Sequence, residues 1–216
     1  MNTNCKICSS ETELWYDKQF NINYYHCNNC QFISMDDNNI VSKESEKEVY
    51  DLHNNSYENE GYLNMFRGFI DASIIPFASE GKTALDFGSG PEPVLAQLLG
   101  KEYKYKLDIY DLYYSPKKVY ENNKYDLITS TEVIEHISNP LEYFELFKSL
   151  LNKDGILGLM TLFHHEDKTH FMDWHYRRDT THISFFTPKT MDYIANKIGF
   201  TQIYNDNKRC CSFKLK

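Results

Sequence analysis

The 216-residue sequence lacks two features of membrane and secreted proteins. It has no apolar run approaching the roughly 20 residues that a membrane-spanning helix needs. Its opening residues, MNTNCKICSS, do not show the charged and then apolar pattern of a secretory signal. We therefore expect a cytoplasmic protein without a membrane partner.

The sequence also lacks an excess of positive charge. It carries 23 Lys and Arg residues against 31 Asp and Glu residues, and residues 1–60 alone carry 4 against 11. Binding to a nucleic-acid backbone requires a basic face. The composition therefore weighs against a nucleic-acid partner, although local pairs such as Lys117-Lys118 remain. What the chain does have is 41% hydrophobic residues, including 14 Phe and 17 Tyr, enough for one main domain and a small appendage.

Cysteine is scarce but patterned. Four of the 6 cysteines form two Cys-x2-Cys pairs, Cys5 with Cys8 and Cys27 with Cys30. Each pair presents two thiolates at a turn, and two such turns complete a tetrahedron around Zn²⁺. Four thiolates close the coordination sphere, so we expect a structural zinc ion in a ribbon formed by residues 1–35. Four free thiols or two disulfides are the alternatives.

From residue 81 onward, predicted strands and helices alternate. The predicted strands are 83–87, 106–110, 125–130, 155–161, 200–204 and 210–215, and the predicted helices are 93–99, 139–151 and 188–198. This order predicts an α/β fold with a doubly wound, mostly parallel sheet in a domain of residues 81–216. The turn at 205–208 makes the last two strands an antiparallel hairpin.

Residues 36–80 precede this domain. Their first part, 36–60, is polar and acidic and is expected to be a linker. From residue 61 the apolar spacing predicts a helix, which Pro76 ends or kinks. We expect the whole segment to act as a lid over a cofactor or substrate.

A glycine-containing loop follows the first predicted strand of the domain. Gly88 and Gly90 stand where a dinucleotide-binding loop has its first two glycines, but Pro93 replaces the third. That third glycine permits close helix–strand packing where a helix N-terminus holds a pyrophosphate. S-adenosylmethionine is a nucleoside ligand without phosphate, so it relaxes this demand. Asp111, at the end of the next strand, would accept hydrogen bonds from both ribose hydroxyls.

Four segments, in order, resemble the motifs of class I S-adenosylmethionine-dependent methyltransferases: LDFGSGPEPV (85–94), DIYD (108–111), YDLITSTEVIEHISNP (125–140) and LLNKDGILGLMT (150–161). The chain is most similar to a bacterial group (methyltransferase types 11 and 23) that has an N-terminal zinc ribbon and a segment like WHYRRDTTHISFFT (174–187). The resemblance implies a Rossmann-like fold. The cofactor-binding residues it implies are Asp86, Gly88, Ser89, Gly90, Asp111, Leu112, Thr131, Glu132 and Tyr62.

The sequence departs from this family at one point. Tyr125 follows Asp111 by only 14 positions, where the family usually fits a helix and a third strand. Residues 117–122 could form a vestigial strand at most. No residue is therefore assigned to the adenine ring.

Methyl transfer is an in-line displacement that needs an aligned acceptor, whose proton is often removed. We expect His182 to act as the general base, aided by Asp179, with Tyr176 as a third catalytic residue. The expected substrate-binding residues are His53, Asn54, Trp174 and His136. Segments 50–62 and 163–182 would close over the methyl group from opposite sides. The alternatives are that His182 is a core histidine and that the histidine-rich segment 163–182 holds a second metal ion.

The expected function is transfer of a methyl group from S-adenosylmethionine to an O, N or C atom of a small molecule. The alternatives are an RNA (rRNA or tRNA) methyltransferase whose ribbon contacts RNA, and a binding module without catalysis. The acidic N-terminal part favours the small-molecule acceptor. The sequence leaves the oligomeric state open.

Overall fold

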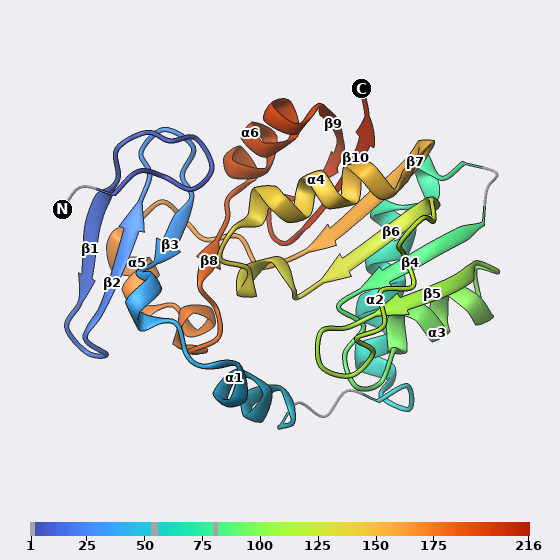
Figure 1. The fold of residues 1–216 in the computed structure, drawn as a ribbon, viewed down its shortest axis with the longest axis horizontal. Coiled ribbons are helices and arrows are strands. Elements are labelled where there is room, and N and C mark those ends of the chain that lie inside the picture. Colours follow the sequence, from blue (N-terminus) through green and yellow to red (C-terminus); the bar gives the residue numbers. More distant parts are fainter. Residues whose placement is uncertain (1–2, 53–55, 80–81) are drawn as a thin grey trace.

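The computed structural model describes residues 3–52, 56–79 and 82–216 (Figure 1). Its larger sheet has the strand order β5-β4-β6-β7-β10-β9. The strands are β4 (Thr83–Phe87), β5 (Lys106–Tyr110), β6 (Tyr125–Thr131), β7 (Leu151–Met160), β9 (Phe200–Asn205) and β10 (Cys210–Leu215). β4 pairs in parallel with β5 and β6, and β6 with β7, whereas β10 is antiparallel to both of its neighbours. The predicted mostly parallel sheet with a C-terminal hairpin is confirmed.

Helices cover both faces of this sheet. One face carries α4 (Pro140–Leu150) and α6 (Pro188–Ile198), and the other carries α2 (Glu60–Ser73) and α3 (Val94–Lys101). Alternation along β4 explains the two layers: Leu85 and Phe87 belong to the core under α4 and α6, and Ala84 belongs to the core under α2 and α3. Both cores are built from strand residues of alternating direction, so neither face is left to solvent.

The ends of α6 show why the predicted helix forms where it does. Thr187 and Thr190 make a reciprocal capping box, and Pro188 occupies the first turn. Gly199 ends the helix in the left-handed region, at φ 92°. These are the start and stop signals that the sequence carries at both ends of the helix.

The sheet ends at β5, without a strand on its outer side in the part of the chain that the structure describes. Residues 117–122, the candidate vestigial strand, form turns. The short connection from β5 to β6 therefore stays as a loop beside the carboxyl ends of the strands.

The N-terminal residues form a second sheet with the order β1-β2-β3-β8. β1 (Glu13–Asp17), β2 (Ile22–His26) and β3 (Ile33–Met35) come from the ribbon, but β8 (Ser184–Phe185) comes from the segment that precedes α6. The cysteine-bearing turns also pack on α6, where Thr190 donates to the Cys30 carbonyl at 2.8 Å. The ribbon thus shares a sheet and a core with the rest of the molecule.

Residues 36–60, expected to be a linker, contain the helix α1 (Lys43–Tyr50). Ser42 caps it by accepting a hydrogen bond from the Ser45 backbone, and Lys47 pairs with Asp51 one turn later at 2.7 Å. The helix has no buried residue, which explains why apolar spacing did not reveal it. The remaining short elements are η1 (Asp37–Asn39), η2 (Ile75–Phe77), η3 (Ile134–His136), α5 (Lys168–Asp173) and η4 (His175–Arg178).

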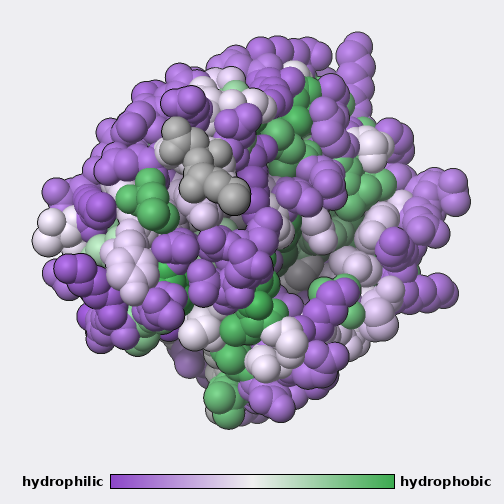
Figure 2. All heavy atoms as spheres, turned by 60° about the vertical axis from the view of Figure 1, so that its left-hand side comes forward, coloured by the Kyte–Doolittle hydropathy of each residue, from purple (hydrophilic) through white to green (hydrophobic). Residues whose placement is uncertain are grey.

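Figure 2 shows a face on which hydrophilic side chains dominate and hydrophobic ones form small separate groups. Among the described residues, no helix combines the length and the apolar character needed to cross a bilayer.

Candidate active site

A cavity of about 700 Å³ opens where β4, β5 and β6 end. Open α/β sheets bind their ligands at this edge. Twelve of the residues expected to bind cofactor or substrate or to act in catalysis line it: Tyr62, Asp86, Gly88, Ser89, Gly90, Asp111, Leu112, Thr131, Glu132, His136, Asp179 and His182. The fold thus gathers residues that are up to 120 positions apart.

The loop after β4 needs both of its glycines. Gly88 and Gly90 have φ values of 84° and 69°, in the region that side chains rarely adopt. A Cβ at Gly88 would lie 2.2 Å from a methyl of Val133, whereas a Cβ at Gly90 would meet no protein atom within 4 Å. Gly88 therefore allows the close approach of the loop after β6, and Gly90 keeps its side of the cavity open. Pro93 caps α3 directly before its first residue, Val94.

Asp111 anchors two loops around the cavity. One of its carboxylate oxygens accepts from the Gly90 backbone at 2.9 Å, and the other accepts from the Tyr113 and Tyr114 backbones at 2.9 and 3.0 Å. Asp111 is buried. A carboxylate offers about four acceptor sites, so these three bonds leave capacity for a ligand hydroxyl.

Asp86, the next-to-last residue of strand β4, has a buried carboxyl group. Its carboxylate accepts from the Thr129 hydroxyl on β6 at 2.9 Å. Burial raises the pKa of Asp86 to about 7, against the hydrogen bond from Thr129, which lowers it. Near pH 7 this carboxyl group, which lines the cavity, therefore exists in both its protonated and its ionised form.

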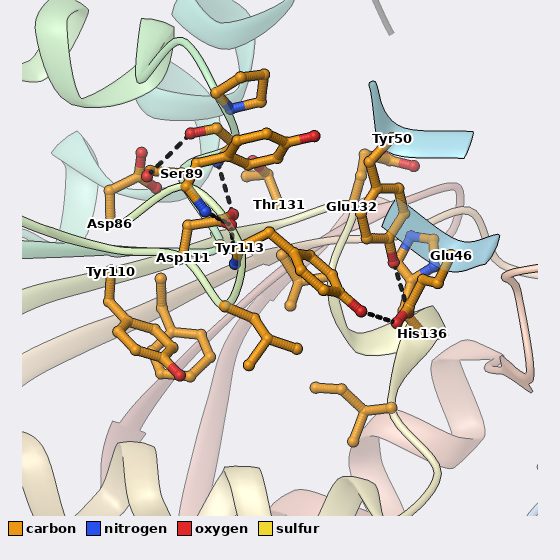
Figure 3. A pocket seen from close by; sticks show the side chains of 18 of the residues that line it. Glu46, Tyr50, Asp86, Ser89, Tyr110, Asp111, Tyr113, Thr131, Glu132 and His136 are labelled. Atoms are coloured by element: carbon orange, nitrogen blue, oxygen red, sulfur yellow. Dashed lines mark hydrogen bonds between the residues drawn. The ribbon is translucent and has the colours of Figure 1, made fainter. Parts of the chain in front are cut away.

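Helix α1 forms one wall through Lys43, Glu46 and Tyr50. Figure 3 shows Tyr50 and Tyr113 directed at the Glu46 carboxylate, to which both phenols donate hydrogen bonds. Tyr113 belongs to the short loop after β5, so this carboxylate ties α1 to the edge of the sheet. In the opposite direction, the Tyr50 ring packs edge-on against His136, with centroids 5.1 Å apart.

The Tyr176 phenol and the carboxyl groups of Glu132 and Glu135 form a hydrogen-bonded group at the end of β6, in which Glu132 lines the cavity and the other two lie behind it. The Tyr176 phenol bonds to Glu132 at 2.9 Å and to Glu135 over a shorter distance. Burial raises the pKa of Glu135 well above its usual range, and the neighbouring Glu132 adds to this effect. A phenol has one proton, so two carboxylate bonds require a further proton shared within the group. Glu132 has a φ of 52°, a strained conformation for this residue type, which is common at functional sites.

His136 and His182 lie together beside this group. Their rings are 4.7 Å apart at the centroids. The Nδ1 atom of His136 is 3.0 Å from the Thr181 carbonyl, and that of His182 is 2.7 Å from the Tyr176 carbonyl. The Nε2 atom of His182 lies 3.8 Å from a carboxylate oxygen of Asp179. A carbonyl oxygen can only accept a hydrogen bond, so both rings carry a proton on Nδ1. In the neutral form of each ring, Nε2 is then the basic nitrogen.

Two further expected site residues do not line this cavity. Trp174 packs with Phe171 and Phe185 on the ribbon side, and Tyr176 lies behind the wall as described. His53 and Asn54, expected to bind substrate, lie outside the described residues.

The four ribbon cysteines converge as their spacing predicts. All four Sγ atoms lie within 4.8 Å of one another. Cys5 and Cys30 are 3.5 Å apart and Cys8 and Cys27 are 3.3 Å apart, sulfur to sulfur, which is too far for a disulfide. A tetrahedral zinc–thiolate site with Zn–S bonds of about 2.3 Å needs sulfur atoms nearly 4 Å apart, so the cluster fits that ion.

Several residues of the site were not among those expected from the sequence. Glu46 was missed because α1 carries apolar residues only at its last two positions, and Tyr113 because it lies in the loop after β5. Tyr50 was expected only as part of the closing segment 50–62. Glu135 was not among the expected residues either, and it is fully buried. Its position among Val133, Ile134 and Ile137 is the signal that could have identified it.

The comparisons with known proteins agree with this architecture. A family model described as "Methyltransferase domain" matches residues 64–205. The solved mitomycin 7-O-methyltransferase MmcR is similar over 81% of this chain and 59% of its own, with 11% identity and a TM-score of 0.56. No curated protein matches the sequence significantly.

Two further solved structures are similar. An O-methyltransferase family protein from Burkholderia thailandensis has 11% identity and a TM-score of 0.53, over 74% of this chain and 58% of its own. LaPhzM has 12% identity and a TM-score of 0.54, over 80% and 59%. At this identity the likeness shows the fold, and the chain spans less than two thirds of the length of each of the three.

Proposed function

Because the chain belongs to the methyltransferase domain family, whose model matches residues 64–205, we propose that it transfers a methyl group from S-adenosylmethionine to a small-molecule acceptor. The observation that carries the proposal is the cavity at the ends of β4, β5 and β6, where Gly88, Gly90 and Asp111 meet. The transfer breaks the bond between the cofactor sulfur and its methyl carbon, and the bonding pair stays on sulfur. A new bond forms from the methyl carbon to the acceptor atom, which releases a proton.

The cofactor fits the residues at this edge of the sheet. The open side of Gly90 leaves space for the methionine and ribose portions, since no protein atom lies within 4 Å of its missing side chain. Asp111 has acceptor capacity for the ribose hydroxyls beyond its three backbone bonds. Leu112, Thr131 and Tyr62 would contact the rest of the ligand from three different elements.

The charge of the cavity supports a small acceptor over an RNA strand. Among the described residues that line it, seven are acidic, and Lys43 is the one lysine, with no arginine. A polyanionic backbone would be repelled from such a wall. The similar structures include one named for the O-methylation of mitomycin, a small molecule. We therefore favour O-methylation among the possible acceptor atoms.

We propose that His182 activates the acceptor. It lines the cavity, and its Nε2 atom faces Asp179 at 3.8 Å. Tyr176 holds the histidine through its backbone carbonyl and holds Glu132 and Glu135 through its phenol. Tyr176 would therefore position the acceptor end of the site from behind its wall.

We also propose that the ribbon cysteines hold one structural zinc ion. The four thiols provide a closed donor set, which leaves no position for a substrate. The nearby His26 lies outside this cluster, stacked on Trp15 at 4.3 Å.

The proposed function is tested by calorimetric titration of the protein with S-adenosylmethionine. Asp111→Asn removes the negative charge while keeping the shape of the side chain. The variant should bind roughly ten- to a hundredfold more weakly, or about 1.5–3 kcal/mol.

Asp108→Asn is the matched control. Asp108 lies on β5, the strand directly before Asp111 in the chain, but it accepts from Tyr125 at 2.7 Å and is outside the cavity lining. Its variant should therefore bind like the wild type. Absence of binding by the wild type, or equal affinity of Asp111→Asn, would overturn the proposal.

A further inference from the structure

We propose that Glu135, His136 and His182 form a binding site for a divalent metal ion at the acceptor end of the cavity. The site is inferred from the described side chains, and its catalytic role rests on the proposed function. It is separate from the cysteine cluster of the ribbon.

The three side chains converge from two segments. Glu135 and His136 belong to η3, after β6, and His182 belongs to the segment before β8. One potential ligand atom from each lies within 4.8 Å of the others. Backbone hydrogen bonds hold the two segments together, since Ile183 donates to the Glu135 carbonyl at 2.8 Å. The Ser184 hydroxyl adds a bond to the Ile137 carbonyl at 2.6 Å.

The two histidines are oriented as metal ligands usually are. Metal-binding imidazoles generally donate their second N–H to a carbonyl or carboxylate, which fixes the tautomer and the ring orientation. Here His136 donates through Nδ1 to Thr181, and His182 donates through Nδ1 to Tyr176. Both rings therefore have Nε2 as the atom that would bind the metal ion.

Glu135 supplies an independent observation. The residue is fully buried, and among the described residues its Oε2 atom has no hydrogen-bond partner. Leaving a buried polar atom unsatisfied is unfavourable, and it is more so for a charged group. A cation held between this carboxylate and the two imidazoles would satisfy that oxygen.

The donor set selects the kind of ion. Two imidazoles and one carboxylate suit ions such as Mn²⁺, Fe²⁺, Co²⁺ and Zn²⁺, whereas Mg²⁺ and Ca²⁺ prefer oxygen ligands alone. Three protein ligands leave at least one coordination position open. Because His136 and His182 line the cavity, that position faces the space where the acceptor would lie.

An ion here would bind the acceptor oxygen and lower the pKa of its hydroxyl group. The released proton would pass to Asp179, whose carboxylate lies 3.8 Å from Nε2 of His182. The acceptor oxygen then attacks the sulfonium methyl, and the bonding pair remains on sulfur as before. In this scheme His182 activates the acceptor as a metal ligand, and Asp179 is the proton acceptor.

The test titrates the zinc-containing protein with Mn²⁺ alone and follows the electron paramagnetic resonance signal of the free ion. Thiolate clusters bind Mn²⁺ poorly, so the ribbon should not interfere. The wild type should remove about one Mn²⁺ per chain from solution. His136→Ala, His182→Ala and Glu135→Gln should each weaken binding at least tenfold, since each removes or neutralises one of three ligands.

His175→Ala is the matched control, because His175 is an exposed histidine of the same segment outside the cavity lining. It should bind Mn²⁺ like the wild type. Circular dichroism establishes that each variant is folded, and if Glu135→Gln does not fold, the half-buried His136 provides the decisive variant.

Failure of this proposal can be told apart from failure of the proposed function. If the wild type binds no Mn²⁺, or the three ligand variants bind it equally well, the metal site is wrong. Calorimetry with S-adenosylmethionine on the same preparation then shows whether the protein binds the cofactor even though the metal site is absent.

Discussion

Asp86 is a buried residue whose ionisation should affect stability. Its folded-state pKa is about 7, raised by burial from a usual value of 3.8. Between pH 4 and pH 7 the folded chain therefore holds a proton on this group that the unfolded chain has released. The contribution of Asp86 to the free energy of unfolding should then fall as the pH rises through that window.

We predict that Asp86→Asn removes this pH dependence. The amide keeps an oxygen for the Thr129 hydroxyl but cannot ionise. At pH 8 the variant should be more stable than the wild type by roughly 4 kcal/mol, because the pKa is raised by about three units and each unit corresponds to about 1.4 kcal/mol. Urea unfolding at several pH values measures the difference.

Thr129→Val is the companion variant. It removes the hydroxyl that donates to Asp86 at 2.9 Å and lowers the pKa of that carboxyl group. The loss of stability should then continue to a higher pH than in the wild type. Equal pH profiles for the wild type and Asp86→Asn would show that Asp86 ionises normally.

At the scale of single residues, local sequence motifs identified part of the site, but they could not identify contacts between residues far apart in the sequence. Local sequence was enough to select Gly88, Gly90 and Asp111, because it indicates both the need for glycine in the loop and the position at the end of a strand. The contact of Tyr176 with Glu132 and Glu135 spans more than 40 positions. No local pattern encodes it, because it depends on how the segment before β8 folds back over η3.

At the scale of helices and strands, the apolar strands were predicted well. The segments 83–87 and 106–110 coincide with β4 and β5, and 188–198 coincides with α6. Buried strands and amphipathic helices bury enough apolar surface to leave a clear period in the sequence. Helix α1 buries no residue and has apolar residues only at its last two positions. Strand β8 consists of two residues whose pairing with β3 is set by tertiary packing.

We predict that Cys8→Ser releases zinc and also loosens the segment before α6. Removing one of four ligands weakens the cluster, and β3 then loses support for its pairing with β8. Zinc content should fall from about one ion per chain to near zero. Amide hydrogen exchange should quicken in residues 1–35 and in residues 183–187.

The control for this prediction is Cys210→Ala, since Cys210 lies in β10 of the larger sheet. It should keep its zinc and its exchange pattern. A Cys8→Ser protein that retains zinc, or one that is loosened only within residues 1–35, would contradict the coupling through β8.

At the scale of the whole molecule, the ribbon and the larger domain share buried contacts. Cys5, Ile7 and Phe32 belong to the same core cluster as Phe186 and Met191. A buried ion pair also joins Asp17 of β1 to Arg177 of η4. Replacing either partner would leave the other as an unpaired buried charge, which typically costs about 3–5 kcal/mol.

From these contacts we predict that the zinc-loaded protein unfolds in one thermal transition. We also predict that S-adenosylmethionine raises the melting temperature of the whole transition. At a hundred times its dissociation constant, a ligand adds about 2.7 kcal/mol to the free energy of unfolding. For a chain of this size the melting temperature should then rise by about 5–10 °C. Both tryptophans, Trp15 and Trp174, belong to the cluster on the ribbon side, so their fluorescence reports the part away from the cofactor. Fluorescence and far-ultraviolet circular dichroism should shift together, whereas a fluorescence transition that stays fixed while the dichroism shifts would mean that the ribbon unfolds independently.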